Sequence, residues 1–100
     1  MYYLLMYDLV PDYLERRTAY RLAHFELAKA AVARGELCLG GALAEPAENA
    51  LLLFQGDSPA AAERFAKEDP YVLHGIVTQW QIRPWTIVVG AGVTAIEPPL

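Results

Sequence analysis

Cysteine is almost absent from this chain of 100 residues, since Cys38 is the only one. No internal disulfide is therefore possible, and we expect a reducing compartment, the cytoplasm. The stretch Leu37-Cys38-Leu39 supplies no cationic neighbour that would activate the thiol. We interpret Cys38 as a small apolar residue in a strand and not as a nucleophile.

Basic clusters, long apolar runs and ligand sets are also missing. Lys and Arg number 8 against 12 Asp and Glu, a net charge of −4, and no basic run marks a nucleic-acid surface. The apolar run Ile87-Val88-Val89 is far below the roughly 18 residues of a membrane helix, and the first residues do not resemble a signal peptide. Two His and one Cys do not make a metal site, and neither GxSxG nor a phosphate loop occurs. We expect no metal, cofactor, nucleic acid or membrane partner.

Apolar residues, in contrast, make up 55% of the sequence. This is high for a small soluble monomer, where polar residues must cover a large relative surface. We therefore expect part of the apolar surface to lie between subunits. The length is that of one domain, so we assign residues 1–100 to a single domain, with the tail from about residue 91 loosely ordered.

Apolar patterns and turn residues divide the chain into six main elements. The first helix begins after Asp12, a candidate cap with Glu15 three residues later, and ends at Gly35. The second begins at Ser58-Pro59 and must stop before Pro70. The expected order is a strand over residues 2–8, a helix from about 13 to 34, strands over 37–43 and 51–54, a helix from 60 to about 68, and a strand from 76 to about 83.

Glycine and proline predict two local details of the strands. Gly40-Gly41 inside the second strand indicates a bulge or a close approach of the backbone. Pro84-Trp85 is expected to end the last strand, with Thr86 to Val89 adding a short edge strand.

The order β-α-β-β-α-β predicts an α+β fold of the ferredoxin-like type, a four-stranded antiparallel sheet. Right-handed crossovers place both helices on one face of that sheet. The segments Leu4-Leu5-Met6 and Leu51-Leu52-Leu53-Phe54 are apolar on both faces, so the second face also needs a cover. The simplest cover is an identical subunit, and we predict a homodimer formed through the sheet face.

The first predicted helix carries three polar side chains along its apolar stripe. Arg17, Arg21 and His24 follow the spacing i, i+4, i+7, where core residues are expected. Charged groups are costly to bury unless they are paired or used by the protein, so these three are candidates for a functional site. The stripe itself consists of Leu14, Phe25, Ala28 and Val32, with Tyr20 and Ala31 at its flank.

Asp69 is a second unusual position, just beyond the predicted end of the second helix. A carboxylate there meets the negative end of the helix dipole and calls for a nearby cation. Arg17, Arg21 and His24 are the candidates. We predict that His24 and Asp69 lie within hydrogen-bond reach, directly or through one water, because a carboxylate orients an imidazole for general acid–base catalysis.

Each of these residues also has a purely structural interpretation. His24 is consistent with a hydrogen-bonded core histidine, and the two arginines with side chains that reach past the sheet edge to solvent. Asp69 before a proline is a common turn start, and core packing explains Tyr71. His74 shows no partner in the sequence and is interpreted as a loop residue.

Four motifs together resemble those of the YciI-like (YCII-related domain) family. They are, in order, Glu15-Arg16-Arg17-x-x-x-Arg21-x-x-His24, Gly40-Gly41, Asp69-Pro70-Tyr71 and Ile82-Arg83-Pro84-Trp85. The resemblance implies a ferredoxin-like fold of the dimeric α+β barrel superfamily and an active-site pair, here His24 and Asp69. That superfamily includes isomerases, dehalogenating enzymes, monooxygenases and haem-dependent peroxidases, so the resemblance specifies no reaction.

The residues and the resemblance favour a small cofactor-independent enzyme with lyase or isomerase chemistry on a small anionic or aromatic metabolite. His24 is the expected general acid/base and Asp69 orients it, while Arg17, Arg21 and Tyr71 bind the substrate. Two alternatives stay open. One is a non-catalytic ligand-binding or accessory module with the same polar pocket, and the other is a buried ion network that serves only the dimer.

Overall fold

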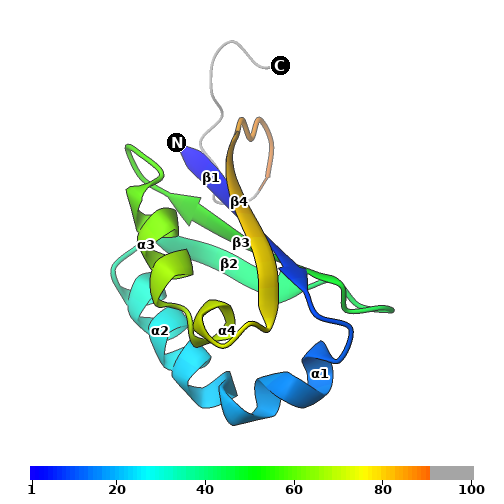
Figure 1. Cartoon of the computed structure of the whole chain (residues 1–100). Helices are drawn as coiled ribbons and strands as arrows, with labels where there is room; N and C mark the ends of the chain where they lie inside the picture. The colour runs from blue at the N-terminus through cyan, green and yellow to red at the C-terminus, as the bar shows by residue number, and fades with distance from the viewer. Residues whose placement is uncertain (91–100) are drawn as a thin grey trace.

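The structure is built on an antiparallel sheet of four strands in the order β2-β3-β1-β4 (Figure 1). The computed structural model describes residues 1–90, and the tail predicted from about residue 91 lies outside them. The strands are β1 (Tyr2–Leu9), β2 (Leu37–Ala42), β3 (Asn49–Gln55) and β4 (Val77–Trp85). β1 pairs with both β3 and β4, so the first strand of the sequence lies in the middle of the sheet. The predicted ferredoxin-like order is confirmed.

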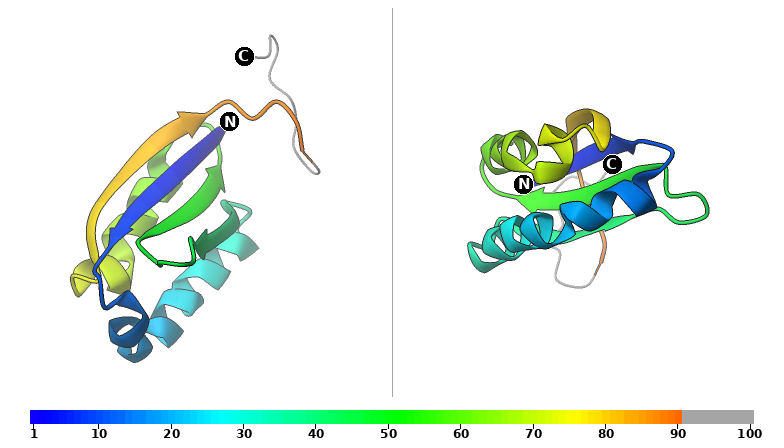
Figure 2. Two further views of the ribbon diagram at one scale, coloured as in Figure 1. Left: turned by 90° about the vertical axis from the view of Figure 1, so that its right-hand side faces the viewer. Right: turned by 60° about the horizontal axis from the view of Figure 1, so that its bottom comes forward.

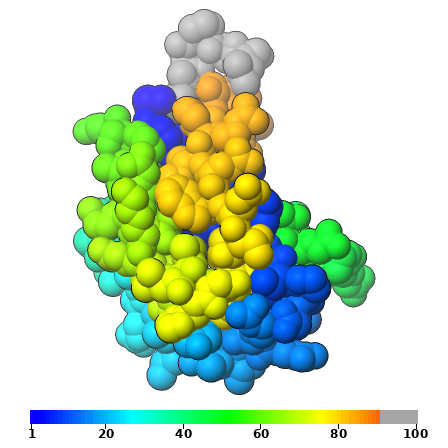
Figure 3. Space-filling view, viewed as in Figure 1, coloured from blue at the N-terminus to red at the C-terminus, as the bar shows by residue number. Residues whose placement is uncertain are grey.

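The helices lie along one face of this sheet (Figure 2). α2 (Arg21–Ala33) runs beside β2, whereas α3 (Ala60–Glu68) lies over β1 and β4, and α4 (Pro70–Leu73) lies beside β4. In the space-filling view, side chains of α3, α4 and β4 lie against one another (Figure 3). None of the helices in residues 1–90 has the length and hydropathy that crossing a membrane requires.

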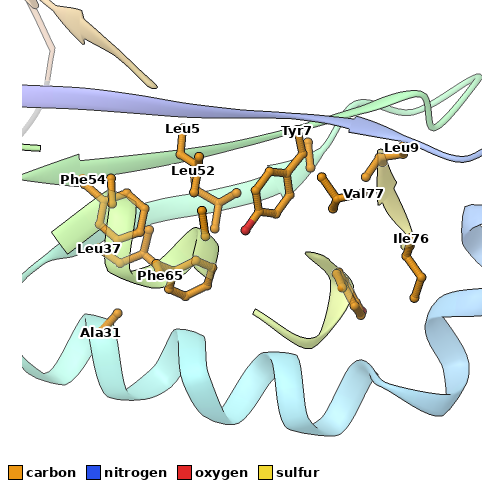
Figure 4. Close-up of a cluster of buried hydrophobic side chains, with 14 of the residues drawn as sticks. Leu5, Tyr7, Leu9, Ala31, Leu37, Leu52, Phe54, Phe65, Ile76 and Val77 are labelled. Atoms are coloured by element: carbon orange, nitrogen blue, oxygen red, sulfur yellow. The ribbon is translucent and has the colours of Figure 1, made fainter. Parts of the chain in front are cut away.

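The core lies between the sheet and the helices (Figure 4). Alternate residues of β1, namely Tyr3, Leu5 and Tyr7, are buried on the helix side, because successive side chains of a strand point to opposite faces. They pack with Phe54 of β3 and Phe65 of α3, whose rings meet edge to face at 5.5 Å. The structure thus shows which face of β1 the helices cover, whereas the sequence of this strand is apolar on both faces.

The segment predicted as one helix from about 13 to 34 is broken, which corrects that prediction. α1 (Tyr13–Arg16) is followed by a 3-10 turn, η1 (Arg17–Ala19), and α2 begins only at Arg21. Leu14 therefore does not share a stripe with the apolar residues of α2, and it is exposed. Asp12 precedes α1 but its side chain makes no cap hydrogen bond, so the predicted cap is also wrong.

Contacts with distant segments explain the break better than local propensity does. Tyr13 of α1 is buried with its ring edge-on to that of Tyr71, at 6.0 Å between centroids. Arg16 donates from Nη2 to the carbonyl oxygen of His74 at 3.2 Å. The end of the helix is as predicted, since α2 stops before Gly35, whose φ of +76° lies in the left-handed region that favours glycine.

Three further details differ from the prediction. The strand β2 is not one of them, since Gly40 makes the predicted close approach: a Cβ there would lie 3.3 Å from Cγ of Leu52, while the irregularity of β2 falls between Leu37 and Leu39. α3 has the predicted bounds, but Pro59 and not Ser58 is its N-cap residue, and Ser58 accepts from the backbone N–H of Ala60 at 3.3 Å. The short helix α4 was not predicted at all.

The end of the last strand is the third correction. β4 continues through Pro84 to Trp85, because β4 is an edge strand and a proline there removes no ladder hydrogen bond that the fold needs. Pro84 pairs with Tyr3 in the register of β1 and β4. Residues 86–89 form no strand in the structure.

Candidate active site

Asp69 lies at the junction between α3 and α4 and is 0% exposed. Pro70 disfavours helical geometry in the residue before it, and the ψ of 121° at Asp69 ends α3 and redirects the chain. The carboxylate then accepts from the backbone N–H of Tyr71 at 3.0 Å and caps α4. The dipole of α3 alone would make a carboxylate at this end unfavourable. Capping of α4 offsets that effect, because the same residue opens the next helix.

Two side chains complete the surroundings of this carboxylate. Nδ1 of His24 lies 2.8 Å from Oδ1, and the hydroxyl of Tyr7 donates to Oδ2 at 2.7 Å. The predicted contact between His24 and Asp69 is therefore present and direct. Of the three candidate cations, His24 is the partner of Asp69, and within residues 1–90 neither Arg17 nor Arg21 forms an ion pair with it. Every buried side-chain polar atom within residues 1–90 has a hydrogen-bond partner.

Tyr7 is the member of this cluster that sequence reasoning missed. It comes from the centre of β1, 62 positions before Asp69, and its hydroxyl reaches from the sheet into the layer below (Figure 4). Burial, together with the charge of Asp69 and the hydrogen bond to it, raises the pKa of Tyr7 far above its ordinary value. The Tyr7 hydroxyl therefore stays protonated and donates to Asp69. A tyrosine at a core-facing strand position needs a hydrogen-bond partner for its hydroxyl, and this requirement could have identified Tyr7 from the sequence.

The His24 ring is held on its face as well as through Nδ1. It stacks on Tyr71 with 4.0 Å between centroids and 6° between planes, and it meets the edge of Phe65 at 6.1 Å. The side chain is 14% exposed. Since an ionised carboxylate only accepts, the hydrogen bond to Asp69 assigns the proton to Nδ1 and leaves Nε2 as the acceptor. This is the tautomer that a general base requires.

His24 opens onto a pocket of about 620 Å³ between α2 and the sheet. Arg17, Arg21 and Tyr71 also line it, so the structure brings together all the predicted site residues. The Arg17 guanidinium lies 5.1 Å from the centroid of the Tyr13 ring, and that of Arg21 lies 4.7 Å above Phe25. Within residues 1–90, neither arginine is ion-paired with a carboxylate. The pocket thus carries uncompensated positive charge beside the imidazole.

His74 lies in a turn directly after α4, as predicted, but it is not without a partner. Its ring stacks on Tyr20 with 4.1 Å between centroids. It does not line the pocket, so the second histidine of the chain is separate from the site. In the described part of the chain, no group of three His, Cys, Asp or Glu side chains is placed to hold a metal ion.

Comparison with known proteins places the chain in a family. The model of the YCII-related domain matches residues 1–86. The chain belongs to the YCII-related domain family. The resemblance inferred from its four motifs is therefore confirmed. A search of curated proteins found no match.

One solved structure has a fold similar to that of this chain. It is 5-chloro-2-hydroxyhydroquinone dehydrochlorinase (TftG) from Burkholderia phenoliruptrix AC1100, in complex with 2,5-dihydroxybenzoquinone. The TM-score is 0.70 at 18% identity, and the match covers 85% of this chain and 93% of that chain. At this identity the likeness establishes the shared fold.

Proposed function

We propose that this YCII-related chain is a small cofactor-independent enzyme of the lyase or isomerase type, acting on a small anionic or aromatic metabolite. The observation that carries the proposal is the His24 ring, fixed through Nδ1 by a fully buried carboxylate and stacked on Tyr71, at the wall of a cationic pocket. A purely structural histidine needs neither a free ring nitrogen nor two unpaired guanidinium groups beside it.

Proton transfer at Nε2 is the chemistry that this arrangement favours. Nε2 takes a proton from a C–H or O–H of the substrate, and the released electron pair forms a new π bond. In a lyase the leaving group departs with its own bonding pair, whereas in an isomerase the imidazolium returns the proton to another atom of the substrate. Asp69 stabilises the imidazolium, and the hydroxyl of Tyr7 and the N–H of Tyr71 hold the carboxylate in position.

The arginines supply the complementary charge. The negative charge that builds up on a substrate oxygen as the proton leaves is stabilised by a guanidinium, and Arg17 and Arg21 both line the pocket. Burial raises the pKa of Tyr71, so its hydroxyl stays protonated and is available as a donor. The dehydrochlorinase of similar fold indicates that this scaffold is compatible with elimination chemistry.

A non-catalytic binding module is the second candidate, and one observation favours it. The hydrogen bonds of Asp69 to Tyr71 and Tyr7 are explained by helix capping and core satisfaction alone. In such a module the same pocket binds a small anion, such as a carboxylate, phosphate or sulfate, without turnover.

Turnover measurements separate the two candidates. The purified protein is assayed against lactones and halogenated hydroquinones, together with the variants His24→Gln and His74→Gln. We expect turnover that falls by about 10²–10⁴-fold in His24→Gln, the usual contribution of a general acid–base, and that persists in His74→Gln. Ligand binding without turnover in the unmodified protein favours the module, and equal activity in both variants excludes His24 from the chemistry.

We also propose that the protein is a homodimer formed through the sheet face without helices. Leu4, Met6 and Leu51 are neighbours there through the register of β1 and β3, and they are only half-buried in the single chain. The helices of residues 1–90 lie on the other face (Figure 2), so a second sheet would supply a matching apolar surface. An obligate interface of this kind buries more than roughly 1,200 Å² in total.

A further inference from the structure

The pocket at His24 extends far beyond the residues that the proposed chemistry uses. His24 and the two arginines lie at one end, and Val32, Ala33 and Leu37 line the other. From His24 to Ala33 the axis of α2 advances by about 13 Å, at 1.5 Å per residue. The volume of about 620 Å³ is roughly four times the ~150 Å³ cavity that holds one benzene ring. A single-ring substrate would leave most of the space empty.

Small side chains on the sheet create this space. Gly40 and Ala42 of β2 pair with Leu52 and Ala50 of β3, both of which belong to the helix-side core. Opposite partners in a ladder share a face, so Gly40 and Ala42 also face the helices. The helix therefore meets a glycine and two alanines where larger side chains would close the gap. We call the resulting space between α2 and β2 the α2–β2 groove.

The helix side of the groove is apolar and open. Phe25 is 40% exposed and Val32 is 54% exposed, although both line the pocket together with Ala28. They belong to the stripe that the sequence assigned to the core, so α2 turns its apolar side toward a space that residues 1–90 do not fill. An apolar concavity of this size with a few polar groups at one end is typical of a ligand site.

Of the three basic residues that line the pocket, Arg17 and Arg21 lie at one end of the groove. Lys29 lies further along α2, with its side chain exposed and its Nζ 3.8 Å from Oε1 of Glu26. Arg17 and Arg21 are held over aromatic rings and are unpaired within residues 1–90, so they favour a planar oxyanion near His24. We propose that the ligand of this site is an amphipathic anion: a carboxylate or enolate head at the arginines, joined to an apolar body larger than one ring that lies in the α2–β2 groove. The position of the head rests on the proposed function, whereas the apolar subsite is independent of turnover.

Calorimetric titration with two series of carboxylates tests the subsite. One series runs from butanoate through hexanoate and octanoate to decanoate, and the other compares benzoate with biphenyl-4-carboxylate. Each methylene that enters the groove should tighten binding about fourfold, since burial contributes ~0.8 kcal/mol per methylene. Biphenyl-4-carboxylate should bind more than tenfold tighter than benzoate, with one site per chain.

Matched Ala→Leu variants of α2 show where the apolar part of the ligand binds. Ala33→Leu fills the far end of the groove, whereas Ala30→Leu adds the same side chain to an exposed position of the same helix outside the pocket. We expect Ala33→Leu to weaken decanoate and biphenyl-4-carboxylate by at least tenfold and to leave butanoate and benzoate unchanged. Ala30→Leu should bind every ligand as the unmodified protein does. Ala28→Leu, halfway along the groove, is the second blocking variant.

The outcomes distinguish refutation of the apolar subsite from refutation of the anion site at Arg17 and Arg21. If short carboxylates bind and lose affinity in Arg21→Gln, but longer ones bind no tighter, the subsite is refuted and the anion site stands. If long ligands gain affinity equally in Ala33→Leu, Ala28→Leu and Ala30→Leu, they bind elsewhere and the proposal is overturned. If no carboxylate binds, both the subsite and the proposed anion site are refuted.

Discussion

Removing one hydroxyl from the sheet, in the variant Tyr7→Phe, tests whether the buried carboxylate organises the site. Tyr7 is 1% exposed, and within residues 1–90 its hydroxyl is the only donor to Oδ2 of Asp69, at 2.7 Å. The phenyl ring fills the same space in the variant, so no cavity opens beyond the lost oxygen. The loss is therefore that of one buried hydrogen bond to a charged acceptor.

Such a bond contributes about 2 kcal/mol to the free energy of unfolding. In a chain of this length that loss lowers Tm by on the order of 10 °C. Tyr3→Phe is the matched control, because Tyr3 lies on the same strand and the same face and is 6% exposed. Its hydroxyl donates only to the sulfur of Met1 at 3.7 Å, a weak acceptor, so we expect a loss below ~0.5 kcal/mol.

Urea unfolding of the three proteins at one fixed protein concentration measures the difference, since a dimer makes the apparent stability concentration-dependent. A double-mutant cycle of Tyr7→Phe with Asp69→Asn should show coupling of about 1 kcal/mol or more. Equal losses in Tyr7→Phe and Tyr3→Phe, or additive effects in the cycle, would refute the view that Tyr7 holds the carboxylate.

Three further predictions concern pH and assembly. Because the pKa of Tyr7 is raised in the folded protein, only the unfolded chain releases the proton of the Tyr7 hydroxyl above about pH 10. The free energy of unfolding should therefore fall as pH rises above this value, and the urea midpoint of Tyr7→Phe should fall less steeply. Hydrogen bonds from Arg34 and Arg64 lower the pKa of Glu36. The stability that Glu36 contributes is therefore present above the ordinary glutamate pKa and is lost as pH falls through the lower pKa of the folded state. Urea unfolding of Arg64→Gln should show a smaller loss of stability on the acid side. Leu51→Lys on the helix-free sheet face should convert a dimer into a monomer in sedimentation velocity, and a monomeric unmodified protein at micromolar concentration would contradict the interface.

Much of the fold follows from local patterns in the sequence. The apolar and aromatic run over residues 2–8 predicts the first strand. Because this run is apolar on both faces, it does not show which face the helices cover. The break before Pro70 is predicted by the steric effect of proline on Asp69, which acts over one residue. The His24–Asp69 contact was predicted because a buried charge needs a partner and few candidates existed.

The features that were missed depend on contacts between distant segments. The break between α1 and α2 rests on the packing of Tyr13 against Tyr71, which no local propensity encodes. Tyr7 reaches Asp69 across the core, and a strand pattern does not show which distant residue its side chain meets. The continuation of β4 through Pro84 required knowledge that this strand lies at the edge of the sheet.

In the proposed site, Asp69 binds Nδ1 of His24 and leaves Nε2 free for a ligand in a cationic pocket. Long-range ¹H–¹⁵N correlation NMR of the two imidazoles tests it most directly, recorded at alkaline pH, where an imidazole is neutral, with and without benzoate. We predict that His24 carries its proton on Nδ1 and that its Nε2 resonance shifts on titration, while the resonances of His74 do not move. A proton on Nε2 of His24, or a shift of His74 with none of His24, would contradict the account.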